Sequence, residues 1–269
     1  MPLIKGDLHF HSHHSACNRR HQAGQLVDYH ADCGREAIKE VIAVSKIAYQ
    51  LGYQYLAITN HAQFPTATLT ASAADKHKLI DHNKEIKKID TKQSPRGIHL
   101  LAGVETNIIN NRGQVGLDNK ILKKLDIVIA ANHRPTKMLT RREIMDSFIG
   151  AANNPYVHII GHLTRFIIKL KLEDWAEILD VCEKKGKIIE YNLNAPLYRA
   201  VIKQVAQRNL LVSFGTDTHP EMIIKPLHDH IKGDIIKATR AVKFLNQYGI
   251  STSRIINTYS WPRLKKLLK

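Results

Sequence analysis

His9 and His11 stand two positions apart near the start of the chain, directly after a short apolar run. Residues 3–8 favour a strand, in which successive side chains point to opposite faces. We therefore expect His9 and His11 on one face, with Leu8 and Phe10 on the other. Two imidazoles on one face of a strand can close on a single metal ion. The pair could equally be one core histidine and one surface histidine, so the remainder of the chain has to decide.

Seven short apolar runs predict strands, at residues 3–8, 55–59, 98–104, 126–131, 157–161, 187–192 and 210–215. Helical periods are found at 36–51, 73–89, 140–151, 172–185, 196–208 and 234–248, and a last helix follows Ser260. Thr140 and Glu143 have the spacing of a capping box. Strands that alternate with helices indicate a mostly parallel sheet, and seven repeats predict a closed or nearly closed barrel. No linker divides residues 1–269, which are expected to form one domain.

Every predicted strand ends on a residue that can bind or orient a metal. In chain order these residues are His9 and His11, His61, Glu105, His133, His162, Glu190 and Asn192, and Asp217 and His219. Functional groups of such barrels lie at the carboxyl ends of the strands, so we expect these side chains to meet at one mouth. Imidazoles and carboxylates suit zinc, manganese or iron. The ligands are too many for one ion, and several bridged ions can clamp a phosphate and generate hydroxide near neutral pH.

Further polar residues near this mouth have predicted supporting roles. Metal-bound histidines need partners that hold their rings, and the candidates are Asn60, Asn132, Glu190 and Asn192. Arg134 follows His133, and Arg165 stands three residues after His162. Both arginines could bind phosphate oxygens through their forked guanidinium groups, or they could be solvated surface residues.

The chain is strongly basic, with 40 Lys and Arg against 24 Asp and Glu and a net charge of +16. Such a charge favours phosphate-bearing partners. The lysines are scattered, and aromatic residues make up only 6%, which argues against a base-stacking platform for nucleic acid. A small phosphorylated substrate is therefore preferred as partner, with nucleic acid as the alternative.

Cysteine content and hydropathy indicate the compartment. Three cysteines without a close pair fit a reducing environment. The first residues lack the apolar core of a signal peptide, and no run of about 18 apolar residues predicts a membrane span. We expect a cytoplasmic protein without membrane contact, and the oligomeric state stays open.

Six short motifs carry a family resemblance. They are DLHFHS at 7–12, ITNH at 58–61, GVE at 103–105, NHRP at 132–135, IGH at 160–162 and GTDTH at 215–219. In type and order they resemble the motifs of the PHP (polymerase and histidinol phosphatase) domain family. The resemblance implies a distorted seven-stranded (β/α)7 TIM-like barrel, a trinuclear metal site at the C-terminal ends of the strands, and phosphoesterase activity. The chain is most similar to stand-alone phosphatase-like members, because no polymerase region follows the motifs.

The resemblance also implies a ligand set for each ion. His9, His11, Glu105 and Asp217 would hold the first ion. Glu105 would bridge to a second ion, which His133 and His162 also hold. His61 and His219 would hold the third.

Two positions depart from the family pattern. The second motif usually contains an aspartate where this chain has Asn60, which removes a negative charge near the metal. A further histidine ligand of the third ion is usually found at the place that Cys17 occupies. Three alternatives stay open: Cys17 is a thiolate ligand, His14 or His21 reaches in instead, or the third site is weak.

The sequence thus predicts a metal-dependent phosphoesterase with Glu105, Asp217 and His219 as catalytic residues. A metal-bound hydroxide would attack the phosphorus in line. Two or three divalent ions are expected, with zinc preferred over manganese or iron. Phosphomonoesters such as histidinol phosphate are preferred over diesters. One alternative is a phosphodiesterase or nuclease that acts on nucleic acid or dinucleotides, and another is a non-catalytic binding module that metal stabilises.

Overall fold

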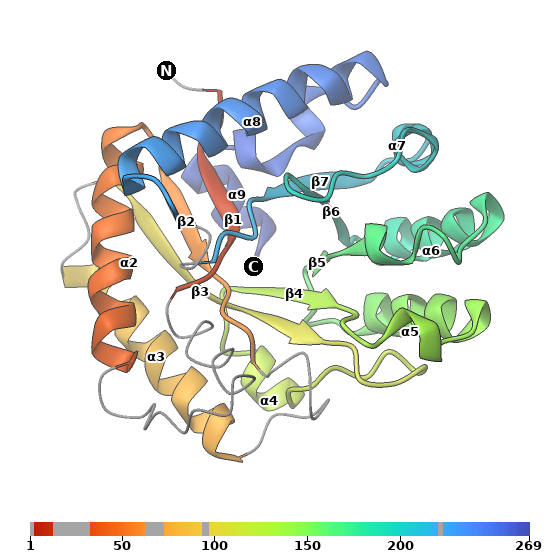
Figure 1. The fold of residues 1–269 in the computed structure, drawn as a ribbon, viewed down its shortest axis with the longest axis horizontal. Coiled ribbons are helices and arrows are strands. Elements are labelled where there is room, and N and C mark those ends of the chain that lie inside the picture. The colour runs from red at the N-terminus through yellow and green to blue at the C-terminus, as the bar shows by residue number, and fades with distance from the viewer. Residues whose placement is uncertain (1–2, 13–32, 63–72, 93–96, 220–222) are drawn as a thin grey trace.

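Seven parallel strands form one sheet in the computed structural model of the chain, and each strand pairs with the next one in sequence. The structure describes residues 3–12, 33–62, 73–92, 97–219 and 223–269. The strands are β1 (Gly6–Phe10), β2 (Tyr55–Ile58), β3 (His99–Asn107), β4 (Ile127–Ala131), β5 (Ile159–Ile160), β6 (Ile188–Asn192) and β7 (Leu211–Gly215). The sheet curls into a nearly closed barrel with helices around it (Figure 1), which confirms the predicted fold class.

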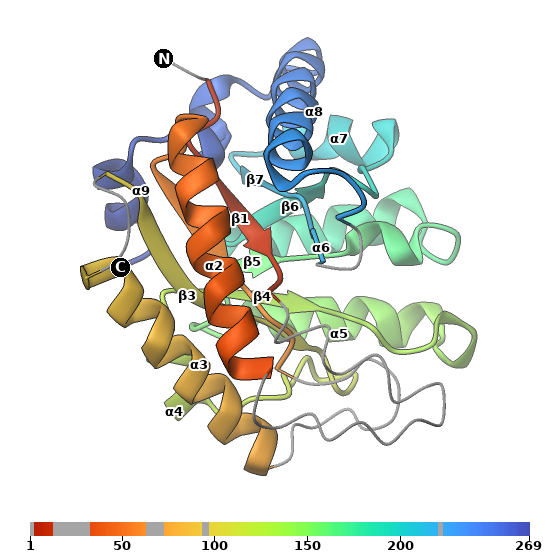
Figure 2. The ribbon, with the colours of Figure 1, turned by 60° about the vertical axis from the view of Figure 1, so that its left-hand side comes forward.

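Helices connect the strands on the outside of the barrel. They are α2 (Cys33–Gln50), α3 (Ala73–Lys92), α4 (Asn119–Leu122), α5 (Arg141–Asn153), α6 (Leu172–Lys184), α7 (Arg199–Ala206), α8 (Leu227–Gln247) and α9 (Trp261–Leu267). Short 3-10 turns include η2 (Thr136–Met138), η3 (Leu163–Phe166), η5 (Thr252–Arg254) and η6 (Ile256–Thr258). Figure 2 shows α2 and α3 side by side on the outer face of the first strands. No helix among the described residues has the length and apolar composition that a bilayer crossing requires.

The barrel interior is apolar at its N-terminal end and polar at its C-terminal end. Inward residues of the lower half form a buried cluster with the C-terminal segment, which includes Leu8, Tyr55, Ala57, Leu101, Ile127, Ile129, Ile159, Ile188, Ile256, Tyr259 and Leu264. The Tyr55 hydroxyl donates a hydrogen bond to the Ile256 carbonyl at 2.9 Å and so connects β2 to η6 of the C-terminal segment. Residues of η6 and α9 thus cover this end of the barrel, and the polar half of the interior lies toward the other end.

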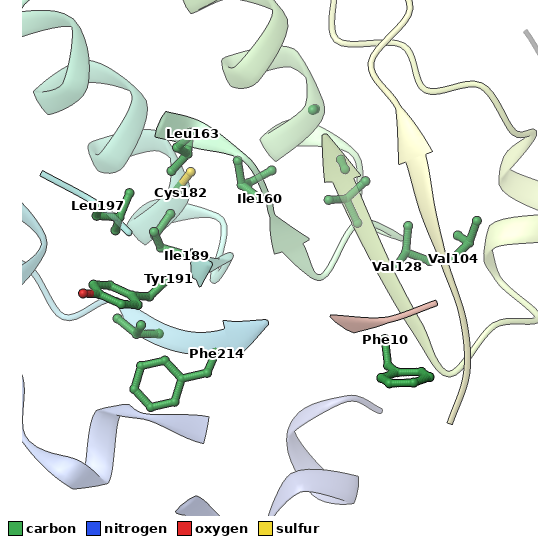
Figure 3. Packing of buried hydrophobic residues seen from close by; sticks show 14 of the residues in the cluster. Phe10, Val104, Val128, Ile160, Leu163, Cys182, Ile189, Tyr191, Leu197 and Phe214 are labelled. Atoms are coloured by element: carbon green, nitrogen blue, oxygen red, sulfur yellow. The ribbon is translucent and has the colours of Figure 1, made fainter. Parts of the chain in front are cut away.

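A second cluster fills the space between the outer face of the strands and the helices. Figure 3 shows part of it, with Val104, Val128 and Ile160 on successive strands and Cys182 of α6 next to Leu163. Cys182 is a buried free thiol, and burial raises its pKa to about 12. An inert thiol of this kind has a packing role.

The first and last strands meet through a few backbone bonds and through buried side chains, among them Asp7, which accepts the Thr216 hydroxyl at 2.5 Å. The His11 N–H donates to the Thr218 carbonyl at 2.9 Å, and the Asp217 N–H donates to the His9 carbonyl at 2.9 Å. Asn257 bridges the same strands, because its Nδ2 donates to the carbonyls of Gly6 (2.9 Å) and Phe214 (3.0 Å). Closure of the barrel therefore places the motif of β1 directly beside the motif of β7.

The prediction that Leu8 and Phe10 share one face of the strand is wrong. Leu8 packs in the inner cluster, whereas Phe10 packs in the outer one, so the two do not share a face. The pairing of β1 with β2 shifts register between Asp7 and Phe10. A bulge of this type breaks the alternation of side chains and re-aims the following ones, which sequence periodicity alone does not reveal.

Several element boundaries also differ from the predicted ones. Strand β3 continues past Glu105, which pairs with Ile129 of β4. The helix predicted at 196–208 begins only at Arg199, because the Asn192 side chain accepts the backbone N–H groups of residues 194 and 195 and holds a turn there. Helix α8 begins seven residues earlier than predicted, after Pro226, a residue that favours helix starts.

The capping box at the start of α5 is confirmed. The Glu143 N–H donates to the Thr140 hydroxyl at 3.2 Å, and the Thr140 N–H donates to the Glu143 carboxylate at 2.8 Å. This reciprocal pair begins α5 right after the loop that follows β4, so the loop carrying His133 is held at both ends.

Candidate metal centre

The carboxylate of Glu105 lies at the centre of the polar half of the barrel. It projects from the inner face of β3 and is 1% exposed. Ring nitrogens of five histidines surround it, at 3.4 Å for His9, 3.4 Å for His11, 2.9 Å for His61, 3.3 Å for His133 and 2.9 Å for His162. The first three face one oxygen of the carboxylate and the last two face the other. Both oxygens are thus oriented toward separate groups of imidazoles.

This carboxylate has the surroundings of a bridging ligand. Neither of its oxygens accepts a well-directed hydrogen bond among the described residues. Burial alone would raise the pKa of Glu105, but the neighbouring His61, His133, His9 and His162 outweigh it and hold the pKa well below its usual value. A buried carboxylate without hydrogen-bond donors requires a cation beside it. Divalent ions between Glu105 and the imidazoles meet this requirement, so the residues present fit a metal centre.

Asp217 supplies the second carboxylate, from the loop after β7. One of its oxygens lies 3.3 Å from His11 and 3.4 Å from His219, and the other lies 3.5 Å from His162. Burial raises the pKa of Asp217, yet His9 and the other imidazoles hold it well below its usual value. Its side chain is 21% exposed, compared with 0% for Glu105. Asp217 therefore lies at the solvent side of the cluster.

The predicted ligands fall into overlapping groups whose donor atoms lie within 4.8 Å of one another. The groups are His9, His11, Glu105 and Asp217; Glu105, His133 and His162; His11, His61 and His219; and His9, His162 and Glu190. The first two contain the same residues as the sets that the family resemblance implies, and the third adds His11 to His61 and His219. Cys17, His14 and His21 lie outside the described residues.

Two of these residues have an unusual backbone conformation. His162 has φ of 52° and Asp217 has φ of 49°, and among the described residues no other non-glycine residue has a positive φ. The left-handed region costs an L-residue roughly 1 kcal/mol. Such strained residues gather at functional sites, where the surrounding fold maintains them. Each lies two residues after the end of a strand, and their side chains approach each other to 3.5 Å.

Two histidines are held by partners on their second ring nitrogen. Nδ1 of His9 lies 2.5 Å from the Glu190 carboxylate, and Nδ1 of His133 contacts the Oδ1 of Asn107. In each case the other nitrogen, Nε2, faces Glu105. This arrangement fixes the ring and leaves Nε2 available as a ligand. The role of Asn107 was missed, although its position two residues after Glu105 on the same strand places it on the same face.

The other predicted partner residues support the loops of the mouth. Nδ2 of Asn192 donates to Asp217 at 3.3 Å. Asn60 exchanges hydrogen bonds with Ser12, whose N–H donates to its Oδ1 at 2.8 Å. Nδ2 of Asn132 donates to the Ser147 hydroxyl at 3.0 Å. An asparagine can make the bonds at position 60 because one amide both accepts from and donates to Ser12.

The histidines differ in their tendency to carry a proton. Burial lowers the pKa of His11 to about 4 and also lowers that of His133. Burial would also lower the pKa of His162 and His9, but the charges of nearby carboxylates outweigh it. They raise the pKa of His162 to about 9 and hold the pKa of His9 well above its usual value. Neutral imidazoles bind metal directly, whereas protonated ones must first release a proton.

Two glycines leave room for Glu190 inside the barrel. A Cβ atom at Gly215 would lie 2.4 Å from the Glu190 carboxylate and 2.8 Å from the Cβ of His9. At Gly161, a Cβ atom would lie 3.2 Å from the same carboxylate. Larger residues at these positions would displace the group that holds His9.

The two predicted phosphate-binding arginines differ in position. The Arg134 guanidinium donates to the Asn111 side chain at 2.9 Å. Arg165, on η3, is exposed. Partial removal from water lowers its pKa, while the charges of Glu105 and Asp217 act in the opposite direction. Arg165 therefore lies within electrostatic range of both carboxylates.

No protein-family model matches the chain. Curated relatives of similar length include a "Probable phosphatase" of Caldanaerobacter subterraneus subsp. tengcongensis, 28% identical over 89% of both chains. The chain is also 27% identical to the DNA polymerase/3′-5′ exonuclease PolX of Bacillus subtilis, over 80% of this chain and 34% of that protein.

A solved structure shares the fold. It is histidinol phosphate phosphatase from Lactococcus lactis subsp. lactis, complexed with zinc, L-histidinol and phosphate. The two structures align with a TM-score of 0.53 over 90% of this chain and 94% of that one, at 17% sequence identity. At this identity the match supports the barrel architecture alone.

Proposed function

We propose that this protein is a metal-dependent phosphatase of the PHP family, with residues 1–269 as one domain. The observation that carries the proposal is the buried Glu105 carboxylate with five imidazole nitrogens at 2.9–3.4 Å. Similarity to proteins named as phosphatases over 89% of the chain supports it.

The proposed ligands follow from the donor groups. His9, His11, Glu105 and Asp217 would hold one ion, and Glu105, His133 and His162 a second. His61 and His219 would contribute to a third ion, with Cys17 as a further candidate ligand. Zinc is the preferred ion, because imidazole and carboxylate donors suit it and the structural neighbour contains it. Ions held there would polarise phosphoryl oxygens and acidify a water molecule near neutral pH.

The protein side chains have separate proposed roles around these ions. Glu105 holds two ligand groups at a fixed separation, because it is buried within the paired part of β3. Asp217 and His219 lie together at the mouth, 3.4 Å apart, where a substrate phosphate would arrive. Glu190 and Asn107 keep His9 and His133 oriented for binding.

Arg165 is the proposed phosphate-binding arginine. We expect Arg165→Ala to raise the KM for a phosphomonoester by roughly tenfold, because one charge-assisted hydrogen bond to phosphate contributes on the order of 1.5–3 kcal/mol. Arg134→Ala should raise it by less, since this guanidinium is already bound to Asn111. Steady-state kinetics of both variants on one substrate measures the difference. A larger effect of Arg134→Ala would reverse the assignment of the two residues.

Chelation tests the proposed function directly. We expect the purified protein to release phosphate from a panel of monoesters, including histidinol phosphate, and to lose this activity after dialysis against a chelator. Zinc or manganese should restore it. Metal content should be measured on the same samples. Metal-loaded protein that hydrolyses no phosphate ester, but unfolds on chelation, would instead be a metal-stabilised binding module.

Action on nucleic acid is the second candidate function. The similarity to PolX and the net charge of +16 favour it. It predicts binding to single-stranded oligonucleotides that weakens steeply with salt, and metal-dependent release of nucleotides. Phosphate release from monoesters without oligonucleotide binding would exclude this candidate.

A further inference from the structure

A cavity of about 870 Å³ opens on the outer side of β6. It lies between residues of α7 and α8, and the loops after β5 and β6 complete its wall. In Figure 1, α8 runs above β7, and α7 lies to the right of β6 and β7. The volume is within the range of small-molecule binding sites, roughly 300–1,000 Å³.

The wall of this cavity is mainly apolar and aromatic. Tyr191 of β6 and Leu197 of the following loop are buried, and both belong to the outer cluster (Figure 3). Phe244 of α8 and Tyr198, which is 56% exposed, contribute further ring surface. Rings and aliphatic side chains of this kind bind apolar groups by removing their surface from water.

The charged residues of the wall are both cations. They are Arg165 and Arg199, and no acidic residue contributes to the wall among the described residues. A positively charged group in this cavity would therefore lose water without gaining a counter-charge. The wall favours an uncharged or anionic occupant.

Arg165 connects the cavity to the metal centre. It lines the cavity together with Ala195, whose N–H donates to Asn192 at 3.1 Å. The Nδ2 of Asn192 in turn donates to the Asp217 carboxylate at 3.3 Å, so this wall adjoins a candidate metal ligand, and the charge of Asp217 acts on Arg165. Thr164 beside it donates to the Ala195 carbonyl at 3.2 Å, which holds the two loops of the wall together. A phosphate bound between Arg165 and the metal ligands would thus have its ester oxygen next to the cavity.

We propose that this cavity binds the alcohol part of the substrate, and that the substrate is a phosphomonoester of an uncharged apolar or aromatic alcohol. This inference rests on the proposed phosphatase function. It separates the chain from a phosphatase for amino-alcohol esters such as histidinol phosphate, because the two arginines disfavour an ammonium group.

A matched pair of substrates tests the proposal. 2-Phenylethyl phosphate and phosphocholine are both esters of primary alcohols, but one carries a phenyl ring and the other a quaternary ammonium group. We expect kcat/KM for 2-phenylethyl phosphate to exceed that for phosphocholine at least about tenfold, as expected for burial of an apolar group in one case and of an unpaired cation in the other. The free alcohol 2-phenylethanol should inhibit competitively.

Ala200→Trp fills the cavity from α7, where Ala200 is an exposed residue of the wall. We expect it to reduce the preference for 2-phenylethyl phosphate severalfold and to weaken inhibition by 2-phenylethanol. Gln207→Trp is the control, because this residue is exposed just after α7 and does not line the cavity.

The possible outcomes distinguish a failure of the proposed substrate class from a failure of the proposed phosphatase function. Chelator-sensitive hydrolysis with equal or better use of phosphocholine, or a preference that Ala200→Trp leaves intact, would overturn the substrate class and retain the phosphatase. Absence of metal-dependent release from every monoester would overturn the phosphatase, and the inference with it.

Discussion

Asp217→Asn is expected to lower turnover by more than about a hundredfold while the protein stays folded. Loss of a residue that only orients a metal ligand costs roughly 10–100-fold, so loss of a ligand itself should exceed this. Asparagine is the suitable replacement, because it tolerates the left-handed backbone that Asp217 adopts at φ 49°. The change therefore removes the charge near His11 and His219 without adding backbone strain.

The measurement is kcat on one phosphomonoester, together with metal content and thermal unfolding. Asp229→Asn is the control, since Asp229 is an exposed carboxylate on α8 whose side chain is 62% accessible. It should retain full activity. Near-normal turnover of Asp217→Asn at full metal occupancy would remove Asp217 from the proposed centre.

The second large effect is expected at Asn257, far from the ligands. Its Oδ1 accepts the Phe214 N–H at 2.6 Å, and its Nδ2 donates to the carbonyls of Gly6 and Phe214. Alanine would leave these buried backbone groups without a partner, at about 1–3 kcal/mol for each. We expect Asn257→Ala to lower the free energy of unfolding by at least about 3 kcal/mol.

Chemical denaturation at constant metal concentration checks this expectation. Asn246→Ala is the matched control, because Asn246 is exposed and makes one long hydrogen bond, 3.4 Å to Thr252. It should change stability by less than about 0.5 kcal/mol. An equal loss in both variants would contradict the role of Asn257 in closing the barrel.

Both predictions concern the junction between the first strand, β1, and the last strand, β7. Strand β1 carries His9, His11 directly follows this strand, and the loop after β7 carries Asp217. Asn257 holds β1 and β7 together from below, whereas metal ions would hold their ends together from above. Bound metal should therefore stabilise the native barrel by mass action, and chelation should lower its unfolding temperature.

The sequence by itself determined the architecture and the chemistry of the strand ends. Apolar runs separated by helical periods predicted seven strands, and all seven are present in the expected order. These patterns are local, because burial on both faces of a strand requires a continuous apolar run. The capping box of Thr140 and Glu143 is equally local and was predicted for the same reason.

The tertiary structure decided what depends on contacts between distant segments. The bulge in β1 places Leu8 and Phe10 on different faces of the strand. The hydrogen bonds of Asn192 make α7 begin later than predicted. Neither feature can be recognised from the periodicity of apolar residues. The partner of His133 is Asn107, 26 residues away. Such pairs form only when strands align.

The same reason applies to the positive φ of His162 and Asp217, to the closure by Asn257 and to the cavity beside Arg165. Each results from several chain segments that constrain one point in space. Residue types and spacing therefore predicted which side chains could bind metal, while only the closed barrel determined how they face one another and which space remains for a substrate.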